Sequence, residues 1–388
     1  MRGHINAVAE KNITQILKEL NIYENIYTDI EVTEVCINTN KKIFTKKLGI
    51  GFVKKDNLSD NDKLTNLLKI LATLDNQQLT DRNPNISTKL ILSNGQKVRI
   101  EGAIPPVVPN PTINIRKQSI VIKTLESYLN DNFLNEETYE ICKNAVLNHK
   151  NILIVGGTDT GKTTFLNALL KVIESQNQRT IIIEDTEELQ MKADNVNRIQ
   201  TIPNIFTPEQ ALKYCMRASP ERVIFGEIRD GRAGYELISG FNSGHPGGIS
   251  TIHADDGIGG LKKLEMYINS AYGTPMSEEI GMAIDIIITI KMKNYKRYLS
   301  SIVACDGYNS LNNQYIIKDL YLAETDNSFS SKEKERLIEY SKNKFNLDEV
   351  QLEILSRRKL EDVENFILNG GHIWKEKEKI DQRQLFHV

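Results

Sequence analysis

Residues 156–163 read GGTDTGKT, and this stretch constrains the fold of the chain more than any other. It matches the pattern G-x-x-x-x-G-K-[ST], with Gly156, Gly161, Lys162 and Thr163 at the defining positions. The apolar run ILIV precedes it, and the helical pattern TTFLNALLKVI follows. A strand, a glycine-rich loop and a helix in this order direct backbone N–H groups and a helix N-terminus at one anion. The stretch therefore predicts a phosphate-binding loop in an α/β domain.

Residues 157–164 are expected to lie around the phosphates of a nucleotide. The Lys162 ammonium is a mobile point charge for the β- and γ-phosphates, and the Thr163 hydroxyl is suited to Mg²⁺. The expected nucleotide-binding residues of the loop are Gly157, Thr158, Asp159, Thr160, Gly161, Lys162, Thr163 and Thr164.

Asp159 is unusual because it puts a carboxylate inside a loop that must hold a polyanion. Aspartate tolerates the left-handed backbone better than most residues, so the loop can keep its shape while the carboxylate points outward. Two unit charges about 6 Å apart interact by about 1 to 3 kcal/mol, depending on screening. We therefore expect Asp159 to weaken nucleotide binding without abolishing it.

Three further short apolar runs, at 180–185, 222–227 and 248–253, predict strands that are buried on both faces of a parallel sheet. Glu184 lies at the end of the first run and Glu227 at the end of the second. The carboxyl ends of parallel strands meet at one edge of the sheet, where ligands bind. These two carboxylates are therefore candidate catalytic groups.

The metal is expected to bind without the usual aspartate, because Gly226 stands where that residue would precede Glu227. Two histidines flank the third run, His245 before it and His253 on its last position. Histidines beside several acidic strand ends predict a role near the nucleotide. Besides water, the expected Mg²⁺ ligands are Thr163, Glu184 and Glu227.

With 388 residues, the chain is long enough for two or three domains. Before the loop, β-branched runs and the hairpin signal Asn94–Gly95 predict an α+β unit. After the loop, strands and helices alternate, which predicts a RecA-like P-loop domain with a mostly parallel sheet. We expect an N-terminal α+β domain over 1–120, a linker over 121–128, the RecA-like domain over 129–324 and a charged helical C-terminal extension over 325–388.

Charge and cysteine content narrow the class of protein further. Lys and Arg total 49 against 51 Asp and Glu, so the net charge is −2 and a globally basic, DNA-coating protein is disfavoured. The four cysteines lack CxxC spacing, which indicates a reducing compartment and neither a disulfide framework nor a zinc site. No signal-peptide run opens the chain, and the longest apolar run, near 283–290, is too short to span a bilayer. We expect a cytoplasmic protein, at most peripheral to a membrane.

Taken together, the motifs resemble one family. GGTDTGKT, IIIEDTEEL, RVIFGEIRD and GHPGGISTIHAD are similar, in this order, to the motifs of ring-forming secretion ATPases of type IV secretion and conjugation systems. VTEVCIN, LTDRNP, KVRIEGAIPPVV and INIRK resemble the N-terminal domain of that family. The resemblance covers 30–324 and is strongest to the conjugal-transfer branch. The chain departs from the pattern at Asp159, Thr160 and Asp255, and after about residue 325.

The resemblance implies a Mg²⁺-dependent ATPase that forms a homohexamer and binds ATP at the junction of its two domains. It implies that Glu184 orients or activates the attacking water and that Glu227 lies beside it, at the Mg²⁺. It also implies that His245 and His253 sense the γ-phosphate.

The resemblance further implies that arginines of the N-terminal domain reach the phosphates. The planar, permanently charged guanidinium matches a phosphoryl group whose charge grows during transfer. The candidate arginine fingers are Arg82, Arg99 and Arg116, and Arg217 and Arg229 are further candidates at a subunit interface. The implied partners are inner-membrane secretion or conjugation components, with peripheral membrane contact and without sequence-specific nucleic acid binding.

Two other functions stay open at this point. The chain could be a motor for pilus extension, pilus retraction or type II secretion, although many such motors carry a four-cysteine metal site that this chain lacks. It could also be a catalytically weak, nucleotide-gated ring subunit, degenerate at Asp159. If the Asp159 carboxylate points to solvent, Asp159→Gly should tighten ATP binding by about 1 kcal/mol. If an arginine such as Arg99 or Arg116 has recruited it across the ring interface, the same change should weaken assembly or turnover.

Overall fold

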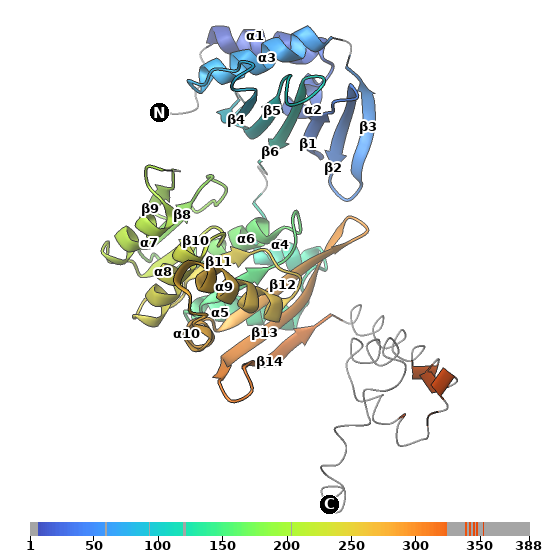
Figure 1. Ribbon diagram of the computed structural model, residues 1–388. Coiled ribbons are helices and arrows are strands. Elements are labelled where there is room, and N and C mark those ends of the chain that lie inside the picture. Colours follow the sequence, from blue (N-terminus) through green and yellow to red (C-terminus); the bar gives the residue numbers. More distant parts are fainter. Residues whose placement is uncertain are drawn as a thin grey trace, which may run out of the picture.

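The computed structural model describes residues 7–323, apart from 59, 93, 119–121 and 203, together with residues 338, 339, 341, 342, 344, 345, 347 and 352. Two sheets organise it, a six-stranded antiparallel sheet and an eight-stranded, mostly parallel one (Figure 1). For these two parts the predicted fold class, an α+β domain followed by a P-loop α/β domain, is confirmed. The extension predicted over 325–388 falls almost entirely outside the described residues.

The six-stranded sheet has the order β3-β2-β1-β6-β5-β4. Strands β4, β5 and β6 alternate between buried and accessible side chains, so this part of the sheet has one apolar and one polar face. The strands are β1 (Val32–Ile37), β2 (Lys42–Lys47), β3 (Gly51–Asn57), β4 (Asn85–Ile91), β5 (Lys97–Ala103) and β6 (Thr112–Lys117). As predicted, β4 and β5 form a hairpin, and Gly95 in its turn has φ +79°.

Helices α1 (Ala7–Glu19), α2 (Tyr23–Tyr27) and α3 (Asn61–Leu74) pack against the apolar face of this sheet. Helix α3 begins where the Asp60 carboxylate accepts hydrogen bonds from two backbone N–H groups of the first turn. Its leucines recur at helical spacing and are fully buried. The opposite, helix-free face is turned toward the second domain (Figure 1).

The eight-stranded sheet has the order β14-β13-β12-β7-β11-β10-β8-β9. Strands β7 (Ile152–Val155), β8 (Thr180–Glu184), β10 (Arg222–Phe225) and β11 (Ile249–Ile252) are the four expected from the sequence, and they run parallel. All their residues are buried, which explains their near-continuous apolar runs. The parallel set is completed by β9 (Val196–Gln200) and β12 (Ile286–Lys293), whereas β13 (Lys296–Asn309) and β14 (Gln314–Leu322) are antiparallel.

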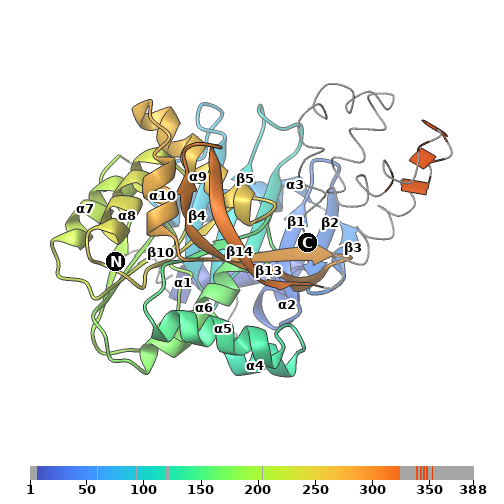
Figure 2. The same cartoon turned by 90° about the horizontal axis from the view of Figure 1, so that it is seen from below.

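Helices cover both faces of this sheet (Figure 2). On one face, α4 (Leu125–Asn130), α5 (Glu136–Leu147) and α6 (Lys162–Glu174) pack over Ile152 and Ile154. On the other, Leu153 and Val155 lie in a core with residues of α7 (Pro208–Met216), α8 (Gly231–Asn242), α9 (Gly257–Tyr272) and α10 (Ser277–Ala283). Successive residues of β7 thus enter opposite cores, as the pleat of a strand requires.

One segment differs from the expectation. Helix α4 begins at Leu125, inside the segment expected to be a linker, where Thr124 caps it by accepting a hydrogen bond from the Ser127 N–H. The apolar run near 283–290 supplies most of β12, which adds the β13–β14 hairpin to the sheet beside β7. Across the described part of the chain, no helix has the length and apolar character needed to cross a membrane.

Candidate nucleotide-binding site

The loop between β7 and α6 has the geometry of a phosphate cradle. Gly161 precedes α6 with φ +96°, and Asp159 has φ +61°, so both lie in the left-handed region. At Gly156, a Cβ would collide with the backbone oxygen of Ile290 on β12, so a side chain is excluded there. The Thr160 hydroxyl closes the loop by donating to the Gly157 carbonyl at 3.0 Å. The backbone thus leaves the first N–H groups of α6 directed at the space above the loop.

Lys162 is buried and folded back onto its own loop. Its Nζ donates to the carbonyls of Gly156 at 2.8 Å and Gly157 at 2.9 Å. Burial lowers the pKa of Lys162 to about 8, although the charges of Glu227 and Asp159 oppose that shift. A phosphate at this loop would offer the ammonium an anionic partner in place of two neutral carbonyls.

A hydrogen-bonded chain links Lys162 to the end of β10. The Lys162 Nζ lies 3.2 Å from His253 Nδ1, and His253 Nε2 lies 2.9 Å from Glu227 Oε1. Burial and the Lys162 charge lower the pKa of His253, which favours the neutral ring. In that ring Nδ1 accepts from Lys162 and Nε2–H donates to Glu227. His253 therefore connects the phosphate loop to a strand-end carboxylate.

Glu184 is buried at the end of β8, and its carboxylate holds the acidic loop that follows, residues 185–188. Its Oε1 accepts backbone N–H groups from Glu188 at 2.8 Å and Leu189 at 2.7 Å, and Oε2 lies 3.8 Å from Arg198. Burial raises the pKa of Glu184 to about 7 against the opposing effect of these contacts. A carboxyl with a pKa near neutrality is suited to exchange a proton.

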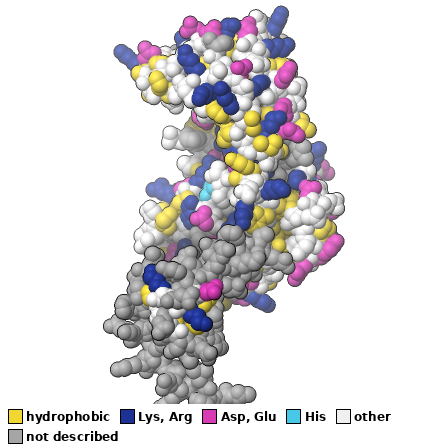
Figure 3. All heavy atoms as spheres, turned by 90° about the vertical axis from the view of Figure 1, so that its right-hand side faces the viewer, with side chains coloured by type: hydrophobic (Ala, Val, Ile, Leu, Met, Phe, Trp, Pro, Cys, Tyr) yellow, Lys and Arg dark blue, Asp and Glu magenta, His cyan; other side chains and the backbone are white. Residues whose placement is uncertain are grey.

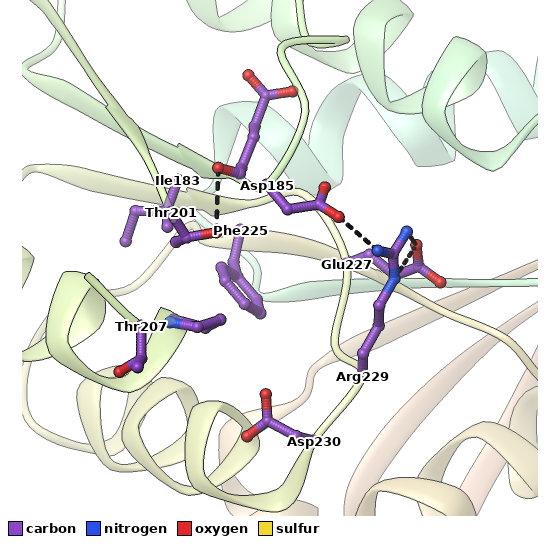
Figure 4. A pocket seen from close by; sticks show the side chains of 10 residues that line it. Ile183, Asp185, Thr201, Thr207, Phe225, Glu227, Arg229 and Asp230 are labelled. Atoms are coloured by element: carbon purple, nitrogen blue, oxygen red, sulfur yellow. Dashed lines mark hydrogen bonds and ion pairs between the residues drawn. The ribbon is translucent and has the colours of Figure 1, made fainter. Parts of the chain in front are cut away.

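Arg229 joins two strand ends at the mouth of a cavity of about 270 Å³ (Figure 4). Its Nη2 lies 2.6 Å from Glu227 Oε2, and its Nη1 forms an ion pair with Asp185. The cavity extends from these groups to the start of helix α7, and Glu184 also lines it. Arg229 thus neutralises the carboxylates of two strand ends within a single chain, and does not need a subunit interface for this contact.

The six-stranded domain presents a row of charged residues to this site. Cross-strand pairing places them side by side: Lys46 opposite Glu34, Glu34 opposite Arg116, Arg116 opposite Arg99, and Arg99 opposite Lys89. On the face in Figure 3, Lys and Arg side chains surround the waist between the domains, where the surface is hollowed. This charged row carries four cations and one carboxylate.

One half of the charged row contacts the acidic loop after β8. Arg99 hydrogen-bonds to the Thr186 hydroxyl and lies 3.7 Å from Glu188, and Lys89 donates to the Asp185 carbonyl at 2.9 Å. Beside the row, Lys97 pairs with Glu187 at 2.8 Å. Arg99 therefore reaches the acidic loop, and it does not contact the phosphate loop.

The other half of the charged row contacts the phosphate loop through Asp159. Arg116 Nη2 lies 2.8 Å from Asp159 Oδ1, and Lys46 forms an ion pair with the other carboxylate oxygen. From the same domain as the loop, Arg297 Nε donates to the Asp159 carbonyl at 2.9 Å. The carboxylate is thus held by cations of its own chain, which differs from the expectation that it points outward.

The structure does not bring two of the expected residues to this cluster. His245 precedes β11 and His253 follows it. They therefore lie at opposite ends of the parallel strands, separated by the length of β11, about 13 Å. The pairing of both histidines at the nucleotide is therefore not found within this chain. Arg82 is exposed before β4, and within the described residues no interaction joins it to the phosphate loop.

Sequence reasoning missed Lys46, Lys89, Lys97 and Arg297. Lysines on amphipathic strands are usually solvated, so a lysine at such a position does not by itself indicate a functional residue. Only the register Lys46–Glu34–Arg116, which depends on two strand pairings, reveals that Lys46 and Arg116 face the same target. Arg297 lies on β13, whose position beside the loop follows from the order of the sheet.

The donor set fits a metal that arrives together with phosphates. In the part of the chain that the structure describes, no group of three or more His, Cys, Asp or Glu side chains could hold a metal ion. Thr163 in the first turn of α6 and Glu227 offer oxygen ligands, and Mg²⁺ commonly combines one or two such groups with substrate phosphates and water. Glu184 is a poorer candidate ligand, because its Oε1 already accepts two backbone N–H groups.

Known proteins resemble this chain along most of its length. The model of the family described as "Type II/IV secretion system protein" matches residues 43–313. The conjugal transfer protein TrbB of Rhizobium radiobacter is 32% identical over 289 residues, which cover 74% of this chain and 87% of TrbB. The type IV secretion system protein VirB11 of Bartonella quintana (strain Toulouse) is 29% identical over 315 residues, covering 70% of this chain and 86% of VirB11.

Among solved structures, the ATPase DotB of Legionella pneumophila has a similar fold. It superposes with a TM-score of 0.55 at 16% sequence identity, covering 78% of this chain and 83% of DotB. This chain belongs to the type II/IV secretion system protein family, and it is an ATPase of the type IV secretion and conjugation class.

Proposed function

We propose that the chain is a Mg²⁺-dependent ATPase that works as a homo-oligomeric ring, a hexamer, and powers a type IV secretion or conjugation apparatus. The observation that carries the proposal is the hydrogen-bonded chain from Lys162 through His253 to Glu227, which joins a phosphate loop to a strand-end carboxylate. The similarity to TrbB along most of its length supports conjugation more than pilus movement or type II secretion.

In this proposal, ATP binds between the two domains, with its phosphates on residues 157–164 and Arg116 on the opposite side. Arg99 acts from the same side by holding the acidic loop. Mg²⁺ bound with ATP would offset the charge of the β- and γ-phosphates, with Thr163 and Glu227 as its protein ligands. Glu184 takes a proton from the attacking water. His253 senses the γ-phosphate through its contacts with Lys162 and Glu227.

Nucleotide binding would hold the N-terminal domain more firmly on the site, and product release would loosen that contact. We propose an N-terminal domain over 1–120 and a P-loop domain that begins at helix α4 and ends at 324, so that the linker expected over 121–128 stops before Leu125. The partners would be inner-membrane components of the apparatus, and the protein would act in the cytoplasm at the face of that membrane.

Lys162→Ala tests the enzymatic part of the proposal. Because the ammonium would stabilise charge on the transferring phosphoryl group, steady-state phosphate release should fall about 100-fold. Lys171→Ala is the matched control, since Lys171 lies on the same helix and pairs with Glu174. Circular dichroism and melting temperature establish that both variants fold. Normal phosphate release from folded Lys162→Ala would mean that the loop is not the active site.

A further inference from the structure

Asp159 connects the phosphate loop to the six-stranded domain by contacts that a phosphate group could make instead. Its side chain is 17% exposed and pairs with Lys46 and with Arg116. Both cations come from the helix-free face of the other sheet, from β2 and β6, with β1 between them. Burial alone would raise the pKa of Asp159, but the Lys46 hydrogen bond and the nearby cations outweigh burial and keep the pKa below its ordinary value.

This half of the charged row carries a net positive charge. Glu34 stands between Lys46 and Arg116 on the sheet, and its carboxylate lies 3.4 Å from Lys46 Nζ. Within the row, two cations and one carboxylate leave one positive charge uncompensated, and Arg297 adds another cation beside Asp159. The Asp159 carboxylate offsets part of this positive charge through its ion pairs with Lys46 and Arg116. A bound phosphate would supply more charge and more acceptor oxygens to the same two donors.

Resting on the proposed function, we propose that Asp159 is a tethered competitor of the nucleotide's phosphates for Lys46 and Arg116. In the empty protein, the carboxylate holds the two cations and keeps the N-terminal domain against the phosphate loop. When a nucleoside polyphosphate binds, the cations exchange the carboxylate for phosphate oxygens. Lys46 thereby becomes a phosphate-binding residue, and Asp159 limits affinity while it preserves the contact between the empty domains.

If Asp159 competes with phosphate for the two cations, removing the charge of Asp159 and removing that of Lys46 should have opposite effects on nucleotide affinity. Asp159→Asn keeps the size of the side chain but frees the cations, so binding of MgADP and of inorganic tripolyphosphate should tighten about 3- to 10-fold. Lys46→Gln removes a phosphate partner, so binding should weaken about 3- to 10-fold. Both effects should shrink between about 50 mM and 300 mM salt. Calorimetric titration measures each constant, with Asp319→Asn on the exposed edge strand β14 as a control that should bind like wild type.

The same two variants should act alike on the empty protein. Spin labels at K69C on α3 and E137C on α5 report the distance between domains, and the four native cysteines are buried. Without nucleotide, Asp159→Asn and Lys46→Gln should both lengthen and broaden this distance relative to wild type. Saturating MgADP should restore the wild-type distance in Asp159→Asn.

The outcomes separate the possible explanations. Equal weakening of binding by both variants would mean that the ion pair is only structural, and would overturn the competition. Asp159→Asn could also tighten binding and leave the distance between the domains without nucleotide unchanged. Asp159 would then only repel the phosphates, and its proposed role in holding the domains together would be overturned. If neither MgADP nor tripolyphosphate bound to wild type or to Asp159→Asn, the proposed function would itself fail. A distance change in the empty variants would then still show the ion pair between domains.

Discussion

At the scale of single residues, the state of Glu184 determines how the site should respond to pH. Burial at the end of β8 raises its pKa to about 7, and the residue lines the cavity beside Arg229. A general base must be deprotonated, so turnover should rise as pH increases through about 7. Glu184→Gln removes both the base and its titration. We expect the pH-rate profile of wild type to fall at low pH, and the residual activity of Glu184→Gln to lack that fall.

The raised pKa of Glu184 also makes the free energy of unfolding depend on pH. The folded-state pKa lies above the ordinary value of 4.5, so the folded protein holds this proton more tightly than the unfolded one. The associated stability is present below about pH 4.5 and is lost as pH rises through about 7. Denaturant titrations of wild type and Glu184→Gln should therefore diverge in favour of the variant between pH 5 and 8, by about 1 to 3 kcal/mol. Parallel pH dependences would contradict the raised pKa.

At the scale of elements, Arg222 shows how the sheet supports the loop that carries His245. This first residue of β10 is fully buried and donates to the carbonyls of Val146 at the end of α5 and of Gly247 before β11. Further acceptors are the side chains of Gln176 and Gln178. All of these partners are neutral, and burial lowers the pKa of Arg222 to about 10. One guanidinium thus connects the end of α5 with the segments that precede β8 and β11.

Removing this guanidinium should destabilise the domain without touching the phosphate loop. Arg222→Ala leaves several buried acceptors without donors and opens a cavity, so the free energy of unfolding should fall by about 3 kcal/mol. Arg217→Ala, at the exposed end of α7, is the control and should change it by less than about 0.5 kcal/mol. Urea titration measures both. A change as small as that of the control would show that water satisfies these acceptors.

At the scale of the whole molecule, the proposed ring makes activity depend on assembly. If the arginines of the N-terminal domain act only when neighbouring subunits close the ring, ATP turnover per subunit should rise with protein concentration. Light scattering should then report a closed oligomer that nucleotide and Mg²⁺ favour. A strictly monomeric protein with full turnover would exclude the ring.

Much of the fold and part of the site could be predicted from the sequence. The phosphate loop was predictable because strand, loop and helix are contiguous, and glycine at 161 meets a local need for positive φ. The parallel strands were predictable because burial on both faces leaves an apolar run in each. Glu227 and His253 could be placed together because the ends of parallel strands share one edge of the sheet.

Tertiary structure alone decided the rest. Asp159 lies 113 residues from Lys46 and 43 from Arg116, so their meeting depends on how the two domains dock. The charged row depends on register, because a slip of one residue in β2 would turn Lys46 to the apolar face of the sheet. His245 and His253 are close in sequence, but the extended strand β11 between them places them at opposite ends of the strands. Local sequence thus determined the phosphate cradle, whereas strand pairing and domain docking determined which charges surround it.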